Sequence, residues 1–577
     1  MNFFKTVLAS VVGFCIALIV LIIIGTIGIA SFAMDDVAQI KDNSILELNF
    51  NGTIKDYVST EQDVFNTVLN VSNEIGFNQI LRVIKTAKND SKIKAISIND
   101  IPWDVGWAQL TELRNELESF KQSGKKVWAY GDFYSQKKYY LASVADKLIL
   151  SPTGSVDLKG LHIETMFYKD FQEKYGFQME VIRHGKYKSA VEPFIANKMS
   201  TENREQISEL INSLWEQVKT DIETSRGFDS EKVVLDLQGK LPHLAKNNNL
   251  IDELWYEDDY RNNFKNTIHE DAEIVKLGDY LQNDLSALDA MTHNDKVAVI
   301  YAQGSIIYGK GDENTIGQDM MLQSFKKAVE NEKVKAIVLR INSGGGSALT
   351  SDLIWNAVEK AKKVKPVVVS MGNYAASGGY YIACNANKIF AEPTTITGSI
   401  GVFGVIPNAN KVAKQNGINS EIVSTHANSS HYSVIQPLNA NLKTNIKEGI
   451  EFIYDTFISK VAQGRNMNIA AVDSIAQGRV WTGAQAKKIG LVDELGSLEN
   501  AVQHAASLAQ INDYLILELP NYEMDFEDIL GINPFATMFS KTSTPVKSEI
   551  ISKVTQLKSV LDMEGIQARI PFLMEIK

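Results

Sequence analysis

Cysteine is scarce in this chain of 577 residues, which contains two, Cys15 and Cys384. Cys15 lies in a long apolar run near the amino terminus and Cys384 lies in a repeated segment, so we expect no disulfide between them. The cysteine count therefore says nothing about the redox compartment. Proline-rich, glycine/serine-rich and other low-complexity tracts are also missing, which is typical of a folded globular protein.

Two further absences exclude whole classes of function. The formal net charge is −11 and there is no basic stripe, which excludes a general nucleic-acid binder, because neutralising phosphates requires clustered lysine and arginine. No CxxC, HExxH or phosphate-binding P-loop pattern occurs, so neither a metal nor a nucleotide cofactor is implied. The length predicts three or four domains of about 150 residues each, or fewer large ones.

One long apolar run stands out at the amino terminus. Residues 7–33 contain no charged residue, and as a helix they would extend about 40 Å, enough to cross a membrane core of about 30 Å. Lys5 precedes the run and Asp35 and Asp36 follow it, so the positive-inside rule places the body of the chain outside the cytoplasm. The alternative is a cleaved signal peptide ending in Ser-Phe-Ala at 31–33, although the apolar part of signal peptides is about 7–15 residues long.

The body of the chain contains the same pattern twice. Residues 131–142 read GDFYSQKKYYLA and residues 372–383 read GNYAASGGYYIA, a separation of 241 residues. The same separation relates LIDEL at 250–254 to LVDEL at 491–495. A register that stays constant over so long a stretch predicts two copies of one fold.

Each copy alternates short apolar runs with longer helical stretches. In the second copy KVAVIYA, KAIVLRI, KPVVVSM and KIFAEP have the composition of strands, and MLQSFKKAVENE and SDLIWNAVEKAKK have the apolar spacing of amphipathic helices. This alternation predicts an α/β fold with βαβ crossovers. We expect four regions, namely a cytoplasmic tip with a transmembrane anchor (1–42), a first copy (43–290), a second copy (291–500) and a carboxy-terminal extension of unknown role that belongs to neither copy (501–577).

Two features of the second copy follow predicted strands. The strand KAIVLRI runs into Gly344-Gly345-Gly346, and the strand KPVVVSM leads to Ser377-Gly378, where an apolar helix begins. A serine between a strand and a helix amino terminus is well placed as a nucleophile, and the Gly378 N–H could stabilise an oxyanion. Gly345 would supply the second oxyanion donor. Taken singly, each feature has a simpler interpretation, a helix cap for Ser377 and a turn for the glycines.

Three motifs occur in order, GKYKSAVEPF (185–194), RINSGGGSALTSD (340–352) and MGNYAASGGYYIA (371–383). Together they resemble the signal peptide peptidase A family of bacterial serine–lysine proteases, in its long, duplicated, membrane-anchored form. The resemblance implies two tandem domains similar to the Clp protease and crotonase superfamily, each an α/β spiral of ββα units. It also implies Ser377 as nucleophile and Lys188 as general base. Gly344 departs from the family, which usually has proline there, and a glycine loosens this loop.

The two copies differ at the residues that the resemblance singles out. At the separation of 241 residues, Ser377 corresponds to Gln136 and Lys188 corresponds to Ser429. The second copy therefore keeps the serine and the first copy keeps the lysine. A working dyad requires both copies, and we expect neither copy to hydrolyse a peptide alone.

A lysine that acts as a base must be uncharged. An ordinary lysine has a pKa near 10.4, and burial can lower it by up to about 3–5 units. The apolar pairs Ala190-Val191 and Pro193-Phe194 would bury Lys188. Ser189 or Ser430 could orient its amine. The spacing of Lys186 and Lys188 alone would instead predict two solvated surface lysines.

The function that we expect is that of a serine endopeptidase without a cofactor, anchored in the bacterial cytoplasmic membrane with its body on the periplasmic side. Its substrates would be cleaved signal peptides and other hydrophobic peptides, and the resemblance implies a homo-oligomer, a ring of four chains. A membrane-anchored scaffold without activity and a crotonase-like acyl-CoA enzyme are the alternatives on the same fold. A histidine-based triad is the alternative mechanism, with His184, His426 or His431 as the base.

Overall fold

The computed structural model describes residues 13–14, 40–50, 54–58, 75–100, 105–236, 241–288, 295–426, 429, 432–522 and 566–569. The predicted anchor at residues 7–33 lies outside this part of the chain except for Gly13 and Phe14. Within the described residues, no helix combines the length and the apolar character needed to cross a membrane.

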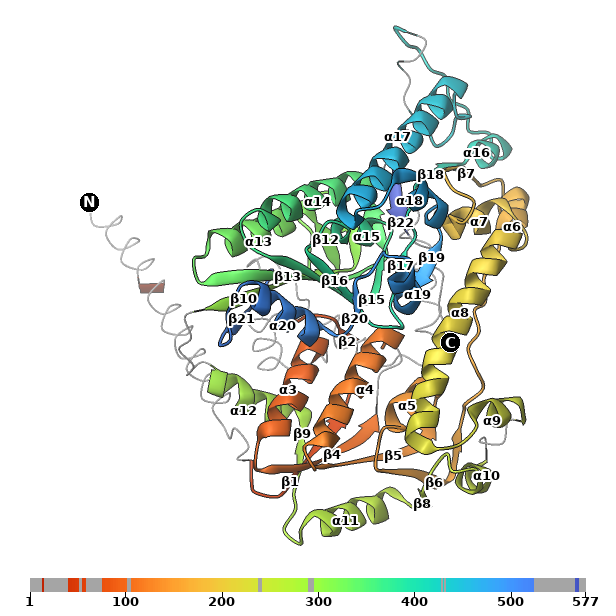
Figure 1. Ribbon diagram of the computed structural model, residues 1–577. Coiled ribbons are helices and arrows are strands. Elements are labelled where there is room, and N and C mark those ends of the chain that lie inside the picture. The colour runs from red at the N-terminus through yellow and green to blue at the C-terminus, as the bar shows by residue number, and fades with distance from the viewer. Residues whose placement is uncertain are drawn as a thin grey trace.

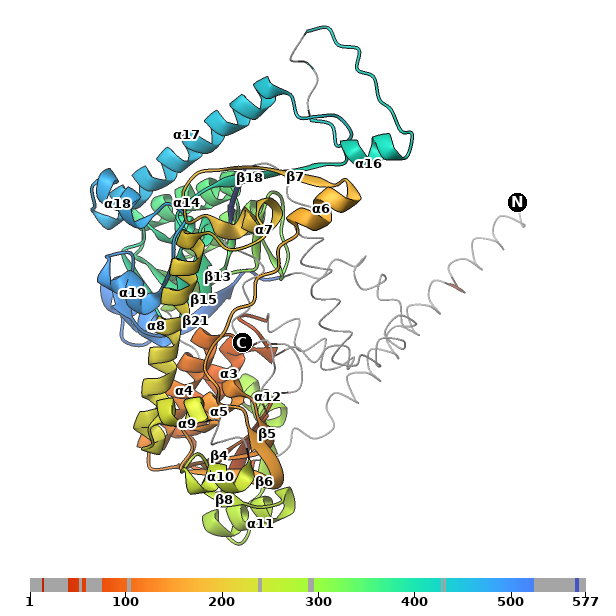
Figure 2. The ribbon, with the colours of Figure 1, turned by 90° about the vertical axis from the view of Figure 1, so that its right-hand side faces the viewer.

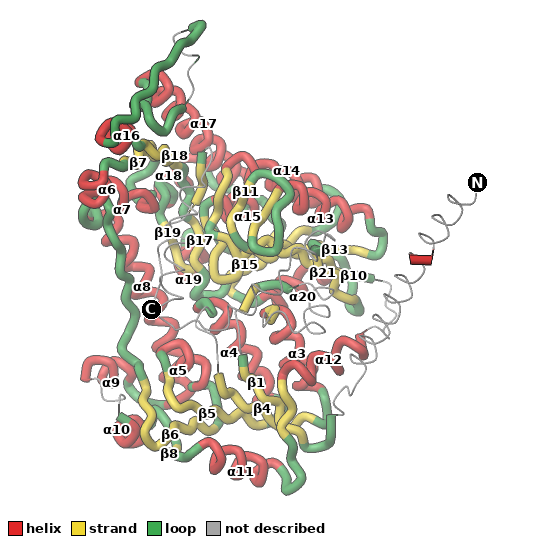
Figure 3. Tube along the Cα trace, turned by 180° about the vertical axis from the view of Figure 1, so that it is seen from behind, coloured by secondary structure: helices red, strands yellow, loops and turns green. Residues whose placement is uncertain are grey.

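Two largely parallel sheets form the centres of the two halves of the molecule (Figures 1 and 3). The first sheet has the order β8 (Glu253–Leu254), β6 (Lys147–Val156), β5 (Lys126–Tyr134), β4 (Ile93–Asp100), β1 (Ser44–Asn49), β9 (Ile274–Lys276). All of its neighbouring strands run parallel. Helices cover both of its faces, which is why its central strands are apolar along their length.

The second sheet repeats this arrangement. Its main order is β19 (Val480–Thr482), β17 (Ile396–Gly398), β15 (Val367–Ala376), β13 (Val334–Ser343), β10 (Lys296–Gln303), β21 (Leu515–Leu519), and β16 (Lys388–Ala391) pairs with both β15 and β20 (Glu494–Leu495). Strand β19 is antiparallel to β17, and the other pairs are parallel. Each half has a core of its own.

The helices also occur in corresponding pairs. These are α3 (Phe77–Asn89) and α13 (Gln318–Glu330), α4 (Trp107–Gln122) and α14 (Ala348–Lys362), α5 (Gln136–Ala142) and α15 (Gly378–Ala383), α8 (Thr201–Arg226) and α17 (Ala440–Arg465), α11 (Glu257–Ile268) and α20 (Leu498–Leu508). The repetition extends to single hydrogen bonds: Tyr139 Oη donates to Leu250 O at 2.9 Å, and Tyr380 Oη donates to Leu491 O at 2.8 Å. The mixed α/β class and the duplication are thus confirmed.

The second copy continues past residue 500. The predicted boundary falls inside α20, which corresponds to α11 of the first copy. Strand β21 then pairs with β10 as β9 pairs with β1. Residues 501–519 therefore complete the second copy, because its sheet needs β21 as its edge strand, and the prediction that they belong to neither copy is wrong for this stretch.

The remaining elements are short or lie at the periphery. They are β2 (Ile54–Lys55), β3 (Ile75–Gly76), α6 (Lys169–Tyr175), the 3₁₀ turn η1 (Ser189–Val191), α7 (Glu192–Ile195), α9 (Ser230–Asp236), α10 (Pro242–Asn247), α12 (Leu277–Leu288), α16 (Asn410–Gln415), α18 (Ile469–Ile475) and α19 (Gly483–Lys488). Among the larger helices, α8 runs alongside both halves (Figures 1 and 2).

The two halves meet through the helices that cover the first sheet. Helices α3 and α4 lie between the first sheet and α20 of the second half (Figure 1). At this boundary Arg340 donates from Nε to Asp56 Oδ2 and from Nη2 to Glu112 Oε2, each at 2.9 Å. All three side chains are buried. Because a buried charge is stable only when it is paired, this cluster fixes how the halves dock.

A third, mixed sheet joins the copies. Its order is β12 (Thr315–Gly317), β11 (Ser305–Ile307), β14 (Gly345–Ser347), β22 (Gln567–Arg569), β18 (Phe403–Asn408), β7 (Gln178–Arg183). Strand β7 comes from the first copy and runs antiparallel to β18 of the second copy, with Arg183 opposite Phe403 (Figure 2). This pairing carries the segment after β7 into the second half.

Candidate active site

The segment that carries Lys188 belongs to the first copy but is held by the second. Immediately before it, the Tyr187 N–H donates to Gln477 O at 2.9 Å. Gly478 lies against the lysine itself, and a Cβ added there would be 2.6 Å from both Lys188 Cβ and Lys188 N. Only glycine permits this approach, so the loop at 477–478 packs directly against the backbone of Lys188.

Ser377 lies at the end of β15, directly before helix α15. It occupies the position of a helix N-cap, yet its side chain makes no capping hydrogen bond. Its backbone has φ 55° and ψ −114°, a combination that costs a non-glycine residue energy and tends to occur at functional sites. The interpretation of Ser377 as an ordinary cap therefore fails, because the hydroxyl points elsewhere.

The hydroxyl of Ser377 faces the amine of Lys188. Lys188 Nζ lies 2.7 Å from Ser377 Oγ and 3.0 Å from both the backbone O and the Oγ of Ser399. All three residues are buried. The two members of the predicted dyad are therefore brought together within one chain, although 189 residues separate them.

Burial sets the charge state of the lysine. Desolvation lowers the pKa of Lys188 well below the ordinary lysine value. Ala190 and Val191 are buried against Phe403, as the prediction of an apolar wall required. An uncharged amine has two N–H donors and one lone pair, so it can donate to the two Ser399 oxygens and accept the Ser377 proton.

Ser399 is the residue that sequence reasoning missed. Ser189 was expected to orient the amine, but its Oγ accepts a hydrogen bond from Gln206 Nε2 at 2.9 Å. The other expected serine, Ser430, lies outside the described residues. A signal for Ser399 existed, because at the separation of 241 residues it corresponds to the apolar Leu158. Like Ser377, it is a serine that the first copy lacks at the corresponding position.

The two predicted oxyanion glycines lie next to each other. Gly345 has φ 97°, and a Cβ added to it would be 2.7 Å from Gly378 N. Gly378 opens α15, where backbone N–H groups lack partners within the helix. The Gly345 N–H donates to Ser343 Oγ at 3.1 Å. Strand β22 also runs beside these glycines, with Arg569 opposite Gly345.

Two of the three candidate histidines lie in the described part of the chain, and both have other partners. His184 Nδ1 lies 2.6 Å from Glu451 Oε2, and its ring stacks on Tyr454. His426 is exposed, with Nδ1 3.0 Å from Thr425 Oγ1. His431 lies outside the described residues. Neither His184 nor His426 is hydrogen-bonded to Ser377.

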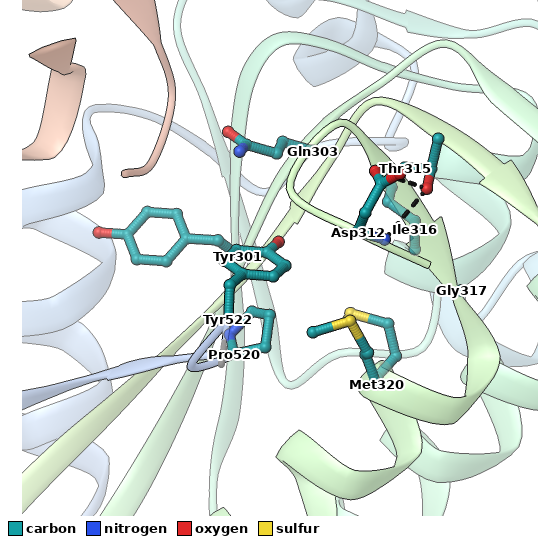
Figure 4. A pocket seen from close by; sticks show the side chains of 10 residues that line it. Tyr301, Gln303, Asp312, Thr315, Ile316, Gly317, Met320, Pro520 and Tyr522 are labelled. Carbon is teal, nitrogen blue, oxygen red and sulfur yellow. Dashed lines mark hydrogen bonds between the residues drawn. The ribbon is translucent and has the colours of Figure 1, made fainter. Parts of the chain in front are cut away.

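We also searched the rest of the described part of the chain for other pockets and metal sites. A small hollow is lined by Tyr301, Asp312, Met320 and Tyr522 among others (Figure 4), and neither Lys188 nor Ser377 belongs to its wall. Over the same residues, no group of three or more His, Cys, Asp or Glu side chains could hold a metal ion.

Comparison with known proteins gives a family. The model of Peptidase family S49 matches residues 119–269 and 359–512, one stretch in each copy. The chain is 31% identical over 557 residues to Protease 4 of Haemophilus influenzae, covering 92% of this chain and 89% of that protein. It is 36% identical over 498 residues to Protease 4 of Salmonella typhi, covering 81% and 79%.

The likeness extends beyond bacteria. The chain is 29% identical over 554 residues to the chloroplastic serine protease SPPA of Arabidopsis thaliana, covering 93% of this chain and 79% of that protein. Among solved structures, it is similar to the ClpP protease catalytic domain from Plasmodium falciparum, with 14% sequence identity and a TM-score of 0.24. That match covers 35% of this chain and 86% of that chain.

Proposed function

Because this chain belongs to peptidase family S49 and is a serine protease, we propose that Ser377 is its nucleophile and Lys188 its general base. One observation supports the proposal above all others, the distance of 2.7 Å between Lys188 Nζ and Ser377 Oγ in a buried site. The lowered pKa of Lys188 adds to it, because only an uncharged amine can take the hydroxyl proton.

In the acylation step, Ser377 Oγ attacks the carbonyl carbon of the substrate peptide bond while its proton passes to Lys188 Nζ. The amine then gives this proton to the leaving nitrogen, and water hydrolyses the acyl-enzyme by the same route. The two oxygens of Ser399 hold the N–H groups of the neutral amine, so that its lone pair is directed at Ser377.

The oxyanion that forms would be held by the N–H groups of Gly378 and Gly345. Each such donor contributes a factor of about 100 to 1,000 in kcat. The Gly345 N–H donates to Ser343 Oγ, so it must share its hydrogen with the oxyanion or turn toward it. Gly344 before it, in place of the family's proline, gives the loop freedom for this movement.

The experiment that tests the dyad is hydrolysis of an internally quenched hydrophobic peptide by the purified full chain. Ser377→Ala and Lys188→Ala should each lose activity by a factor of at least 1,000. Lys186→Ala is the matched control, because Lys186 is exposed and two residues away, and it should keep the wild-type rate. A Lys188→Ala variant that retains most of its rate would place the base elsewhere, and an inactive wild-type chain would favour the scaffold.

We further propose that the protease is anchored in the cytoplasmic membrane and degrades cleaved signal peptides and other hydrophobic peptides on the periplasmic side. The uncharged run at 7–33, with Lys5 before it, supports this placement. Membership of a peptidase family does not support the alternative of a crotonase-like acyl-CoA enzyme. Fractionation of cells, followed by protease treatment of spheroplasts, tests the topology, since only a periplasmic body would be digested.

The duplication supports assembly with further copies of the chain. Within the chain, β7 of the first copy pairs with β18 of the second. The corresponding segments, 419–424 in the second copy and 162–167 in the first, form no strand and are largely exposed in the described structure. We propose that 419–424 of one subunit pairs with 162–167 of the next, in a head-to-tail ring, of four chains by the family resemblance.

Light scattering tests this assembly. Ile422→Pro removes a backbone donor from the proposed strand and should reduce the measured mass to that of one chain. Ile422→Val is the matched control, because it keeps the backbone donor of the proposed strand and should therefore keep the ring. A wild-type chain that is monomeric at all concentrations would contradict the proposal.

A further inference from the structure

Helix α8 buries a glutamine against the segment that carries Lys188. Gln206 lies near the start of this helix and is 2% exposed. Burying an amide side chain costs free energy unless its polar atoms are hydrogen-bonded. In the corresponding helix α17 of the second copy, residues 440–449 are all half-buried or exposed. A buried glutamine at this place is therefore a feature of the copy that supplies the lysine.

The amide of Gln206 bonds the chain on both sides of Lys188. Its Nε2 donates to Tyr187 O at 3.0 Å and to Ser189 Oγ at 2.9 Å. These two atoms belong to the residues directly before and directly after the lysine. Because both bonds come from one side chain of a long helix, the segment cannot slide or turn without breaking them. The amide thus fixes the stretch of backbone from which the Lys188 side chain extends.

The same amide also bonds the strand that borders the serine. Gln206 Oε1 accepts a hydrogen bond from the Val480 N–H at 3.3 Å. Val480 lies opposite Gly398 in the antiparallel pair of β19 and β17. Gly398 O accepts the Ser377 N–H at 2.8 Å, and Ser399 follows Gly398 directly. One side chain of α8 therefore links the lysine segment of the first copy to the part of the second copy that holds Ser377.

A buried carboxylate sets the orientation of the Gln206 amide. Glu192 is 2% exposed and accepts a hydrogen bond from Asn203 Nδ2 at 2.9 Å. Because an ionised carboxylate only accepts, this bond turns Asn203 Oδ1 the other way, where it lies 3.1 Å from Gln206 Nε2. Glu192 also lies 3.6 Å from Arg183 Nη1, which donates to Lys188 O at 3.0 Å. The donor end of the Gln206 amide therefore faces the lysine segment.

We propose that Gln206 is a positioning residue for the reaction, and that it sets the distance between Lys188 Nζ and Ser377 Oγ. It acts through the two segments that it bonds. A general base must lie within hydrogen-bond reach of the proton that it takes, and a displacement of about 1 Å can lower a rate about a hundredfold. The inference rests on the proposed function, because it concerns the same serine and lysine.

Hydrolysis of the internally quenched peptide by the full chain tests the proposal, with kcat and KM measured across pH. Gln206→Met removes the amide and keeps the length of the side chain. We expect kcat to fall about 10- to 100-fold and KM to stay unchanged. The rise of the rate should move to higher pH, because a displaced segment lets water reach the amine. Gln217→Met is the matched control, since Gln217 bonds Asp221 on the same helix, and it should match wild type.

A second variant separates positioning from folding. Gln206→Glu keeps the shape of the side chain but puts an acceptor where Tyr187 O needs a donor. Its carboxylate also places a negative charge beside the lysine segment, which favours the protonated amine. We expect its rate profile to move to still higher pH than that of Gln206→Met. Urea denaturation shows whether each variant is folded, and Gln206→Glu decides the matter if Gln206→Met is not.

Three results would overturn the positioning role. Folded Gln206 variants with the kcat and pH profile of wild type, beside an inactive Lys188→Ala, would refute it and leave the dyad standing. A lower kcat with an unmoved pH profile in both variants would make Gln206 a residue of the fold alone. A Lys188→Ala variant that retains most of its rate would refute the dyad itself, and the inference with it.

Discussion

Lys188 Nζ lies 2.7 Å from Ser377 Oγ, although the lysine belongs to the first copy of the duplicated fold and the serine to the second. Strand β7 crosses to the second half and pairs with β18. The loop after β7, which carries Lys188, packs against Gly478. The proposed dyad is therefore a product of how the two copies dock, and the distance between its two members depends on residues that hold the copies together.

The pH dependence of hydrolysis follows from the burial of Lys188. Because desolvation lowers its pKa well below the ordinary value, the amine is uncharged at a pH where exposed lysines are protonated. We expect kcat/KM to rise with pH through one ionisation below the ordinary lysine pKa and then to level off. Lys188→Arg should be inactive at every pH, since a guanidinium stays charged. A rate profile that keeps rising up to the pKa of an exposed lysine would contradict this.

The same burial should cost stability. A lysine with a lowered folded-state pKa is protonated in the unfolded chain and uncharged in the folded one, so the unfolded state binds more protons below the ordinary pKa. This group therefore makes the chain less stable as pH falls from the ordinary pKa through the folded pKa, and the cost remains at lower pH. Lys188→Met should be inactive, yet its free energy of unfolding in urea at pH 7 should equal or exceed that of wild type. Lys186→Met, which is exposed, is the control.

Ser399 should act as a positioning residue for the amine. Its two oxygens each lie 3.0 Å from Lys188 Nζ. Ser399→Ala removes one of them, and we expect kcat to fall about tenfold, the value of one hydrogen bond to a reacting group. KM should stay unchanged, and the pH profile should shift. Ser189→Ala is the matched control, since Ser189 bonds Gln206 instead, and an equal loss in both variants would contradict the assignment.

Arg479 should hold the lysine loop in place. Its guanidinium bonds Glu205 and Glu209 of α8 and lies 4.8 Å from the centre of the Tyr187 ring, next to Lys188. Arg479→Met should lower kcat about tenfold and move the pH profile to higher pH, because a loosened loop lets water reach the amine. The control is Arg226→Met, which breaks the ion pair with Asp252 far from the dyad in the first copy. It should leave the profile unmoved.

Loss of Arg340 should unfold the boundary between the halves. Asp56 and Glu112 would be left buried without a cation, so Arg340→Met should cost about 3–5 kcal/mol of unfolding free energy. Lys326→Met, in the exposed pair with Glu330 one helical turn away, should cost about 0–1 kcal/mol. Urea denaturation compares the two, and equal losses would show that the buried cluster does not join the halves.

Much of this architecture could be predicted because duplication leaves a record in the order of residues. The constant separation of 241 residues predicted two copies, and Tyr139 and Tyr380 make the same hydrogen bond in each. The end of the second copy was misplaced although the separation of 241 residues relates β9 (Ile274–Lys276) to the first three residues of β21 (Leu515–Leu519), because so short an apolar stretch is a weak signal. Its place in the sheet depends on pairing with β10, and strand pairing is a contact between distant segments.

The sequence by itself determined the class of fold and the repeat, and comparison of its motifs with a family singled out the candidate serine and lysine. Only the tertiary structure decided that the two meet within one chain, that Ser399 rather than Ser189 bonds the amine, and that Ala568 lies at the glycines. The physical reason is that periodicity and motif order are local properties of the chain. Burial, a lowered pKa and a hydrogen bond across 189 residues exist only once distant segments have packed together.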